Sequence, residues 1–116
     1  MVKGSGKPLR QFIYSMDLAR LMLWTLEKYN LRETIILSVG EEDEVSIRDV
    51  AMMIAESYDY SDRVVFDTSA ADGQFKKTAD NSKLKSLHKN LTFIDIKEGI
   101  NESVQWFINN YETCRK

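Results

Sequence analysis

A polar stretch with the residue types of a ligand-binding loop occupies residues 67–84. It holds the acid Asp72, the glycine that follows it, and two lysines, Lys76 and Lys77. A carboxylate accepts hydrogen bonds from sugar hydroxyls, glycine lets a ligand approach the backbone, and ammonium groups attract phosphates. Because a β-branched run at residues 63–66 precedes it, we interpret the stretch as a loop at the carboxyl end of a strand, where α/β folds place their ligands.

A second polar motif surrounds Arg10, which lies between a glycine-rich turn at residues 4–8 and a short extended run at residues 11–14. A planar guanidinium forms paired hydrogen bonds with a phosphate. Each motif taken alone also fits a solvated surface loop. Together, Arg10, Asp72 and Lys77 describe a site for a sugar joined to a diphosphate.

Groups that could carry out catalysis are sparse in this sequence. The one histidine, His88, follows a short helical segment in a polar stretch, and the one cysteine, Cys114, lies near the chain end. Neither has an orienting partner at a recognisable spacing. No glycine motif for a dinucleotide and no metal-ligand spacing is present. We therefore predict no catalytic, cofactor-binding or metal-binding residues in this chain.

The expected elements alternate between helices and strands. Apolar periodicity and capping residues predict the helices, and β-branched runs predict the strands. We expect helices at residues 15–29, 46–58, 81–87 and from 96 onward, and strands at residues 34–39 and 63–66. Ser46 with Asp49, and Asp95, occupy the positions of helix caps.

These elements predict an α/β fold with a small parallel βαβ unit and three main helices. The 15–29 helix is apolar on nearly every side, and the continuous apolar run at 34–39 is typical of a sheet covered on both faces. Two parallel strands alone make a poor sheet. We therefore expect a piece of a larger α/β body, with apolar surface that self-association into a homo-oligomer would cover.

Size and composition set further limits. The chain has 116 residues and a formal net charge of −2, which predicts one domain over residues 1–116 and no nucleic-acid partner. No apolar run approaches the roughly 18 residues of a membrane span, so we expect no membrane partner. A single cysteine fits the reducing cytosol, and we expect a cytoplasmic protein.

Two motifs carry a resemblance to a known family. Residues 10–19, with Arg10, Phe12, Tyr14, Asp17 and Ala19, resemble the R-x-F-x-[HY]-x-x-D-x-[AV] motif of extended short-chain dehydrogenases acting on nucleotide sugars. Residues 38–46 are similar to that family's strand, glycine and serine-capped helix. The 67–84 loop narrows the resemblance to the branch that makes GDP-L-fucose, and the similarity covers residues 2–116.

The resemblance implies the C-terminal, substrate-binding part of an extended Rossmann-type enzyme. The intact enzyme would be a cytoplasmic, homodimeric epimerase/reductase that converts GDP-4-keto-6-deoxy-D-mannose to GDP-L-fucose with NADPH. Arg10 matches an arginine that holds the substrate, and Asp72 matches a substrate-binding aspartate. Lys3 stands where the family usually has tryptophan, which removes a flat packing surface at that edge.

In that family the NADP-binding and catalytic residues lie upstream of the matched portion. The resemblance therefore implies that this chain alone is inactive and does not bind NADP(H) fully. Two alternatives remain open at the level of sequence. The chain could be a truncated or isoform product that acts as a binding or regulatory partner, or an unrelated small α/β domain.

Overall fold

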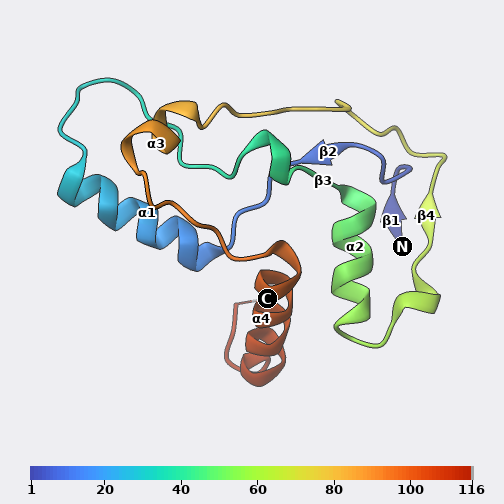
Figure 1. Ribbon diagram of the computed structural model, residues 1–116. Helices are drawn as coiled ribbons and strands as arrows, with labels where there is room; N and C mark the ends of the chain where they lie inside the picture. The colour runs from blue at the N-terminus through green and yellow to red at the C-terminus, as the bar shows by residue number, and fades with distance from the viewer. Residues whose placement is uncertain (116) are drawn as a thin grey trace.

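Four helices carry most of the regular structure in the computed structural model, which describes residues 1–115 (Figure 1). They are α1 (Ser15–Lys28), α2 (Ile47–Glu56), α3 (Ser82–Leu87) and α4 (Ile96–Asn110). Short strands and 3-10 helices connect them: β1 (Val2–Lys3), β2 (Leu9–Arg10), η1 (Glu41–Asp43), β3 (Val45–Ser46), η2 (Ser61–Arg63) and β4 (Phe66–Asp67). The predicted helices are all present.

The strands form two pairs rather than one sheet. β1 lies parallel to β4, with Lys3 opposite Asp67, and β2 lies antiparallel to β3, with Arg10 opposite Val45. A parallel strand–helix–strand arrangement is therefore present, and the mixed helix-and-strand class is confirmed. Its first strand is β1, however, and not the predicted 34–39 segment. The predicted 63–66 strand begins later, at Phe66, because residues 61–63 form η2.

Residues 34–39 do not form a strand, so this prediction was wrong. A strand requires the backbone groups of a neighbouring strand, and in residues 1–115 two side-chain amides take that place. The amide of Asn81 donates to the Ser38 carbonyl at 2.9 Å, and the amide of Gln11 donates to the Val39 carbonyl at 2.8 Å. The apolar run is present, but the sheet that its pattern implies is not.

Two helix starts follow the predicted capping chemistry. The Ser46 hydroxyl accepts a hydrogen bond from the Asp49 amide at 3.0 Å, and the Asp49 carboxylate accepts one from the Ser46 amide at 3.1 Å. This reciprocal pair begins α2. The Asp95 carboxylate accepts a bond from the Lys97 amide at 2.9 Å and begins α4. Both caps are local in sequence, which is why sequence analysis located them.

The start of α1 is held differently. Ser15 is its first residue, and no side-chain cap closes the turn. Asp17, in the first turn, is only 4% exposed. Its carboxylate accepts a hydrogen bond from the Ile94 amide at 2.8 Å and so joins α1 to the segment before α4.

The buried core is small for a chain of this length. The buried apolar side chains are Leu21, Val39, Ala55, Leu84 and Val104. The radius of gyration is 16.6 Å, whereas a compact domain of this length has a value of about 13 Å. In Figure 1, α1 extends away from α2 and α4 instead of packing with them around one sheet. Residues 1–115 therefore lack a single central core.

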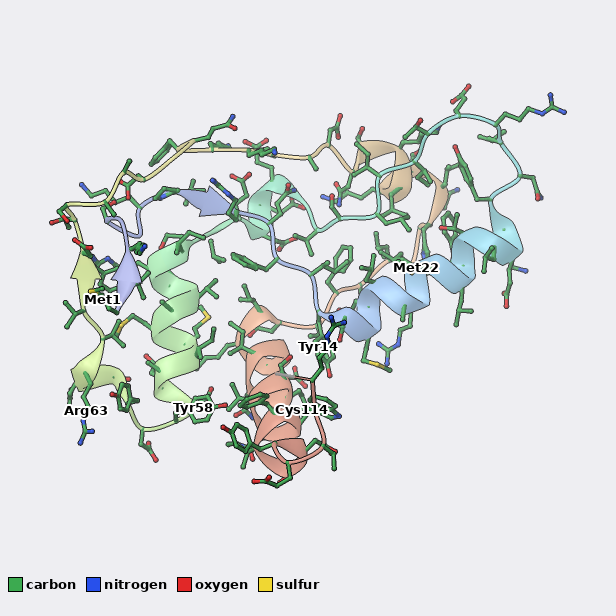
Figure 2. All side chains as sticks on the ribbon, turned by 180° about the vertical axis from the view of Figure 1, so that it is seen from behind. Met1, Tyr14, Met22, Tyr58, Arg63 and Cys114 are labelled. Atoms are coloured by element: carbon green, nitrogen blue, oxygen red, sulfur yellow. The ribbon has the colours of Figure 1, made fainter. Side chains whose placement is uncertain are left out.

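Exposed apolar surface lies along α1, as the sequence predicted. Met22 is 51% exposed and Leu26 is 82% exposed. Figure 2 shows Met22 on the length of α1 that projects from the body. None of the helices within residues 1–115 combines the length and apolar character that a bilayer crossing requires.

Candidate functional site

The N-terminal turn and the late loop lie against each other, although about 65 residues separate them in sequence. The Gly4 amide donates to the Asp67 carbonyl at 2.9 Å, and the Leu9 amide donates to the Phe75 carbonyl at 2.8 Å. The first bond continues the pairing of β1 with β4, which Figure 1 shows side by side, and the second joins β2 to the late loop. The structure thus brings the two motifs singled out from the sequence into one region.

The Asp72 carboxylate is held by Ser5. One oxygen accepts a hydrogen bond from the Ser5 amide at 2.5 Å, and the other accepts one from the Ser5 hydroxyl at 2.6 Å. These bonds, first of all the one from the hydroxyl, hold the pKa of Asp72 below its ordinary value. A carboxylate has about four acceptor positions, so about two remain for a ligand. Ser5 fixes the orientation of Asp72 without using up its acceptors.

Acidification is expected to release this contact. Because the folded-state pKa of Asp72 is depressed, its stabilising contribution is present above the ordinary aspartate pKa and is lost as pH falls through the depressed value. The Ser5 amide resonance should therefore shift on acid titration. Asp72→Asn, which keeps an acceptor oxygen but does not titrate, should abolish that shift. A Ser5 resonance that moves equally in both proteins would contradict the contact.

Arg10 is half-buried and lies in β2, next to the late loop. Its guanidinium donates to its own strand at the Leu9 carbonyl (2.6 Å) and to the late loop at the Gln74 carbonyl (2.9 Å). An arginine has five N–H donors, so with two used, three remain for a ligand. The two carbonyls restrict the rotamers of the side chain, and the remaining donors keep the chemistry for binding a phosphate.

Glycine is required where the turn meets Asp72. Gly4 has a φ of +89°, and a Cβ at that position would lie 2.6 Å from the Asp72 Oδ1 atom. Gly73 also has a positive φ, +68°, but a Cβ there would meet nothing within 4 Å. The two glycines share a backbone conformation and differ in their contacts.

Gly4→Ala is expected to destabilise the fold more than Gly73→Ala. Both substitutions carry the backbone cost of a left-handed residue, about 1–2 kcal/mol. Only Gly4→Ala also displaces the Asp72 carboxylate from Ser5. Urea unfolding of the two variants compares these costs directly. Equal losses of unfolding free energy would show that the close approach of Gly4 to Asp72 is unimportant.

The lysines of the region divide into two groups. Lys3 and Lys77 are exposed, and Lys3 lies opposite Asp67 in the β1–β4 pair. Lys76 instead forms ion pairs with Glu41 and, at 3.4 Å, with Glu44. The hydrogen bond with Glu41 is the main cause that raises the pKa of Lys76. Lys76 therefore secures the loop to the acidic segment.

This contact of the late loop with the acidic run at residues 41–44 was not predicted from the sequence. The Glu44 side chain is only 4% exposed and also accepts a hydrogen bond from the Thr78 hydroxyl. Lys85 pairs with Glu42 in the same region. Opposite charges on the acidic run and the late lysines were the available signal, but sequence alone did not place them together.

His88 and Cys114, the two residues considered for catalysis, lie in different parts of the structure. The His88 ring packs against Trp24, with 4.9 Å between the ring centroids. Cys114 is a free thiol after the end of α4. Across residues 1–115, no group of three or more His, Cys, Asp or Glu side chains is arranged to hold a metal ion.

A cavity of about 440 Å³ lies between the start of α1, α2 and α4. Its lining is largely apolar and includes Phe12, Ile54 and Phe107, with Asp17 as its one charged member. Neither Arg10 nor Asp72 lines it. The candidate polar site and this cavity are therefore separate features.

Known proteins similar to this chain cover it almost completely. A GDP-L-fucose synthase from Dictyostelium discoideum is 60% identical over 99% of the chain, and a probable GDP-L-fucose synthase from Drosophila melanogaster is 51% identical over 99%. The chain spans 36% of the length of each. No family model matches the chain.

Solved structures show the same relationship. The crystal structure of a GDP-L-fucose synthetase from Naegleria fowleri, at 51% identity, superposes on 99% of the chain with a TM-score of 0.96, and the chain covers 35% of it. That protein has also been solved bound to NADP. A dTDP-glucose 4,6-dehydratase from Bacillus anthracis, at 19% identity, shares the fold over 97% of this chain and 35% of its own, with a TM-score of 0.79.

The fold is that of the C-terminal part of the extended, Rossmann-type short-chain dehydrogenase/reductases. This confirms the fold class predicted from the sequence. Within that class, the chain is similar over almost its whole length to the C-terminal third of GDP-L-fucose synthases.

Proposed function

We propose that this chain supplies the GDP-sugar-binding part of a GDP-L-fucose synthase. The observation that carries the proposal is the meeting of the Arg10 turn with the Asp72 loop in a chain 60% identical to such an enzyme. The intact enzyme would convert GDP-4-keto-6-deoxy-D-mannose to GDP-L-fucose by epimerisation and NADPH-dependent reduction. This chain would hold the GDP-linked 6-deoxyhexose during that conversion.

The available hydrogen-bonding groups suit the two halves of such a ligand. Arg10, with three N–H donors to spare, would bind the diphosphate through a planar, permanently charged group. Asp72, with acceptor positions to spare, would bind a pair of hydroxyls, while Ser5 keeps it ionised and oriented. Lys3 and Lys77 would add long-range attraction for the phosphates.

The chemical steps are assigned to the upstream portion that the relatives possess and this chain does not span. NADP(H) would supply the hydride in the intact enzyme. The chain's own role is to bind and orient, because His88 and Cys114 have no catalytic partners among residues 1–115. The unpaired 34–39 segment would pack against the upstream portion. We therefore propose that the chain alone is catalytically inactive.

Two further parts of the proposal rest on composition and surface. A cytoplasmic location is supported by the single free cysteine, Cys114. A homo-oligomeric, specifically homodimeric, enzyme is supported by the amount of apolar surface exposed along α1.

Fragment complementation tests the proposal. The chain is mixed with the separately expressed upstream two thirds of the Dictyostelium discoideum relative, and NADPH oxidation is followed with GDP-4-keto-6-deoxy-D-mannose. Activity is expected from the mixture and from neither part alone. Activity of the 116-residue chain by itself would overturn the assignment of catalysis to the upstream part.

The same mixture separates the enzyme portion from a non-catalytic partner. Co-purification without activity would favour a binding or regulatory role. Restored activity that Arg10→Ala abolishes would favour a substrate-binding role.

A further inference from the structure

Gln11, the residue after Arg10, has a side chain with an unusual set of partners. Its amide nitrogen donates to the Val39 carbonyl at 2.8 Å and to the Ala79 carbonyl at 3.0 Å. Its amide oxygen accepts a hydrogen bond from the Ala79 amide at 2.6 Å. Gln11 therefore binds both backbone groups of one residue of the late loop and one backbone group of the 38–39 segment.

These bonds take the place of a missing strand pair. A neighbouring strand would satisfy the amide and carbonyl of Ala79 through its own backbone, and here one glutamine side chain does so. Gln11 is half-buried, so water competes weakly for these groups. The contact consequently holds Gln11 and Ala79 together more firmly than a surface hydrogen bond would.

Because Gln11 is next to Arg10 in sequence, its contact with Ala79 also affects the candidate site. Arg10 contacts the late loop at Gln74, and Gln11 contacts it at Ala79. Two adjacent residues thus hold both ends of the segment 74–79, just after Asp72. Fixing both ends restricts how far the segment can move relative to the strand β2 that carries Arg10.

The Lys76 ion pairs hold this loop by a different interaction. Lys76 pairs with Glu41 and Glu44 through charges, and the Lys76 and Glu41 side chains are 41% and 66% exposed. Exposed ion pairs contribute little and weaken as salt screens them. The neutral amide of Gln11 is insensitive to such screening. Gln11 is thus a restraint less sensitive to salt than the Lys76 ion pairs, and it acts together with the Leu9–Phe75 backbone bond.

We propose that Gln11 is a positioning residue for the GDP-sugar site, because its amide fixes the loop of residues 72–79 relative to Arg10. The guanidinium and the Asp72 carboxylate then meet one ligand at a set separation. This inference rests on the proposed function and adds to it a residue that does not touch the ligand. It also explains why a polar side chain is placed at the junction of three loosely paired segments.

Amide hydrogen exchange and ligand binding test the proposal together. In the 116-residue chain, Gln11→Ala should accelerate exchange of the Ala79 amide about tenfold. This is the change in the opening equilibrium expected when one hydrogen bond of about 1.4 kcal/mol is lost. The dissociation constant for GDP-mannose, measured by calorimetry, should rise about tenfold. Gln105→Ala, on the exposed side of α4, is the matched control and should change neither value.

Gln11→Glu supplies a readout that a purely structural role would not move. At about pH 8 its carboxylate lacks the donor and repels the Val39 and Ala79 carbonyls, so affinity should fall. At about pH 4, below the ordinary glutamate pKa of about 4.3, most of the carboxyl is protonated and can donate one hydrogen bond again, so affinity should recover in part. Arg10 and Asp80 are next to Gln11 and Ala79 in sequence, and the Asp43 carboxylate binds the Gly40 amide next to Val39. All three are present in Gln11→Ala, whose affinity should not recover.

The outcomes separate this proposal from the proposed function. An Ala79 amide that is unprotected in the unsubstituted chain, or unchanged in Gln11→Ala, overturns the role of Gln11. Faster exchange with unchanged affinity overturns its role in binding. If the unsubstituted chain protects Ala79 but does not bind GDP-mannose, the proposed function of the site fails, while the exchange result still supports Gln11 as the restraint on the loop.

Discussion

Arg10→Ala should weaken binding of GDP-mannose by about 100-fold, because it removes a charge-assisted hydrogen-bonding group that would contact the diphosphate. Hydrogen bonds to charged groups contribute about 1.5–3 kcal/mol, and 100-fold corresponds to about 2.8 kcal/mol. The substitution also removes the donor to the Gln74 carbonyl, which loosens the loop that carries Asp72. Calorimetric titration of the two proteins measures the difference.

Two further variants test whether the loss of affinity is specific to the Arg10 guanidinium. Arg63→Ala removes the same charge in η2, which comes before β4, whereas the candidate loop follows β4 (Figure 2). It should leave the affinity unchanged apart from a small long-range effect. Arg10→Lys keeps the charge but loses the planar fork, so it should recover only part of the binding. Equal affinities for Arg10→Ala and the unsubstituted chain would remove the diphosphate contact from the proposal.

Leu84→Ala should produce the largest loss of stability from a single side chain. Leu84 is fully buried, with 0% exposed, and it lies in the short helix α3. Truncating a buried leucine costs about 2–5 kcal/mol from lost transfer energy and the cavity left behind. Small proteins have total stabilities of about 5–15 kcal/mol, so the loss is a large fraction of the whole. Urea unfolding followed by circular dichroism measures it.

Leu87 provides the matched control within the same helix. It is 44% exposed, so Leu87→Ala should cost only about 0.5 kcal/mol. Similar costs for the two leucines would show that α3 is not anchored through Leu84. The anchoring has consequences for the site, because α3 follows Asn81, which binds the Ser38 carbonyl, and the Ala79 contact with Gln11.

Local sequence signals located the helices well. The capping groups of α2 and α4 lie within three residues of the amides that they bind, so the sequence contains the whole interaction. The expected meeting of Arg10 with the Asp72 loop also agrees with the structure. Its role in substrate binding stays a prediction.

The strands were predicted less well because a strand depends on residues far away in sequence. Residues 34–39 have the composition of a buried strand, but pairing needs a neighbouring strand. In residues 1–115 their carbonyls accept hydrogen bonds from the side chains of Gln11, Asn81 and Lys83 instead. β1 gave no signal because two residues, Val2 and Lys3, have no periodicity. The ion pair of Lys76 with Glu44 was not predicted for the same reason, since the two residues are 32 positions apart in sequence.

Each of the four strands is only two residues long. Ladders this short contain too few backbone bonds to select one alignment, and a shift of one position would turn Arg10 to the opposite side of its strand. The register of the strands must therefore be set by the number of residues in the connecting turns. A single inserted or deleted residue between Gly4 and Leu9 should therefore be more damaging than most substitutions there, so chain length in that turn is under tighter constraint than chemical identity.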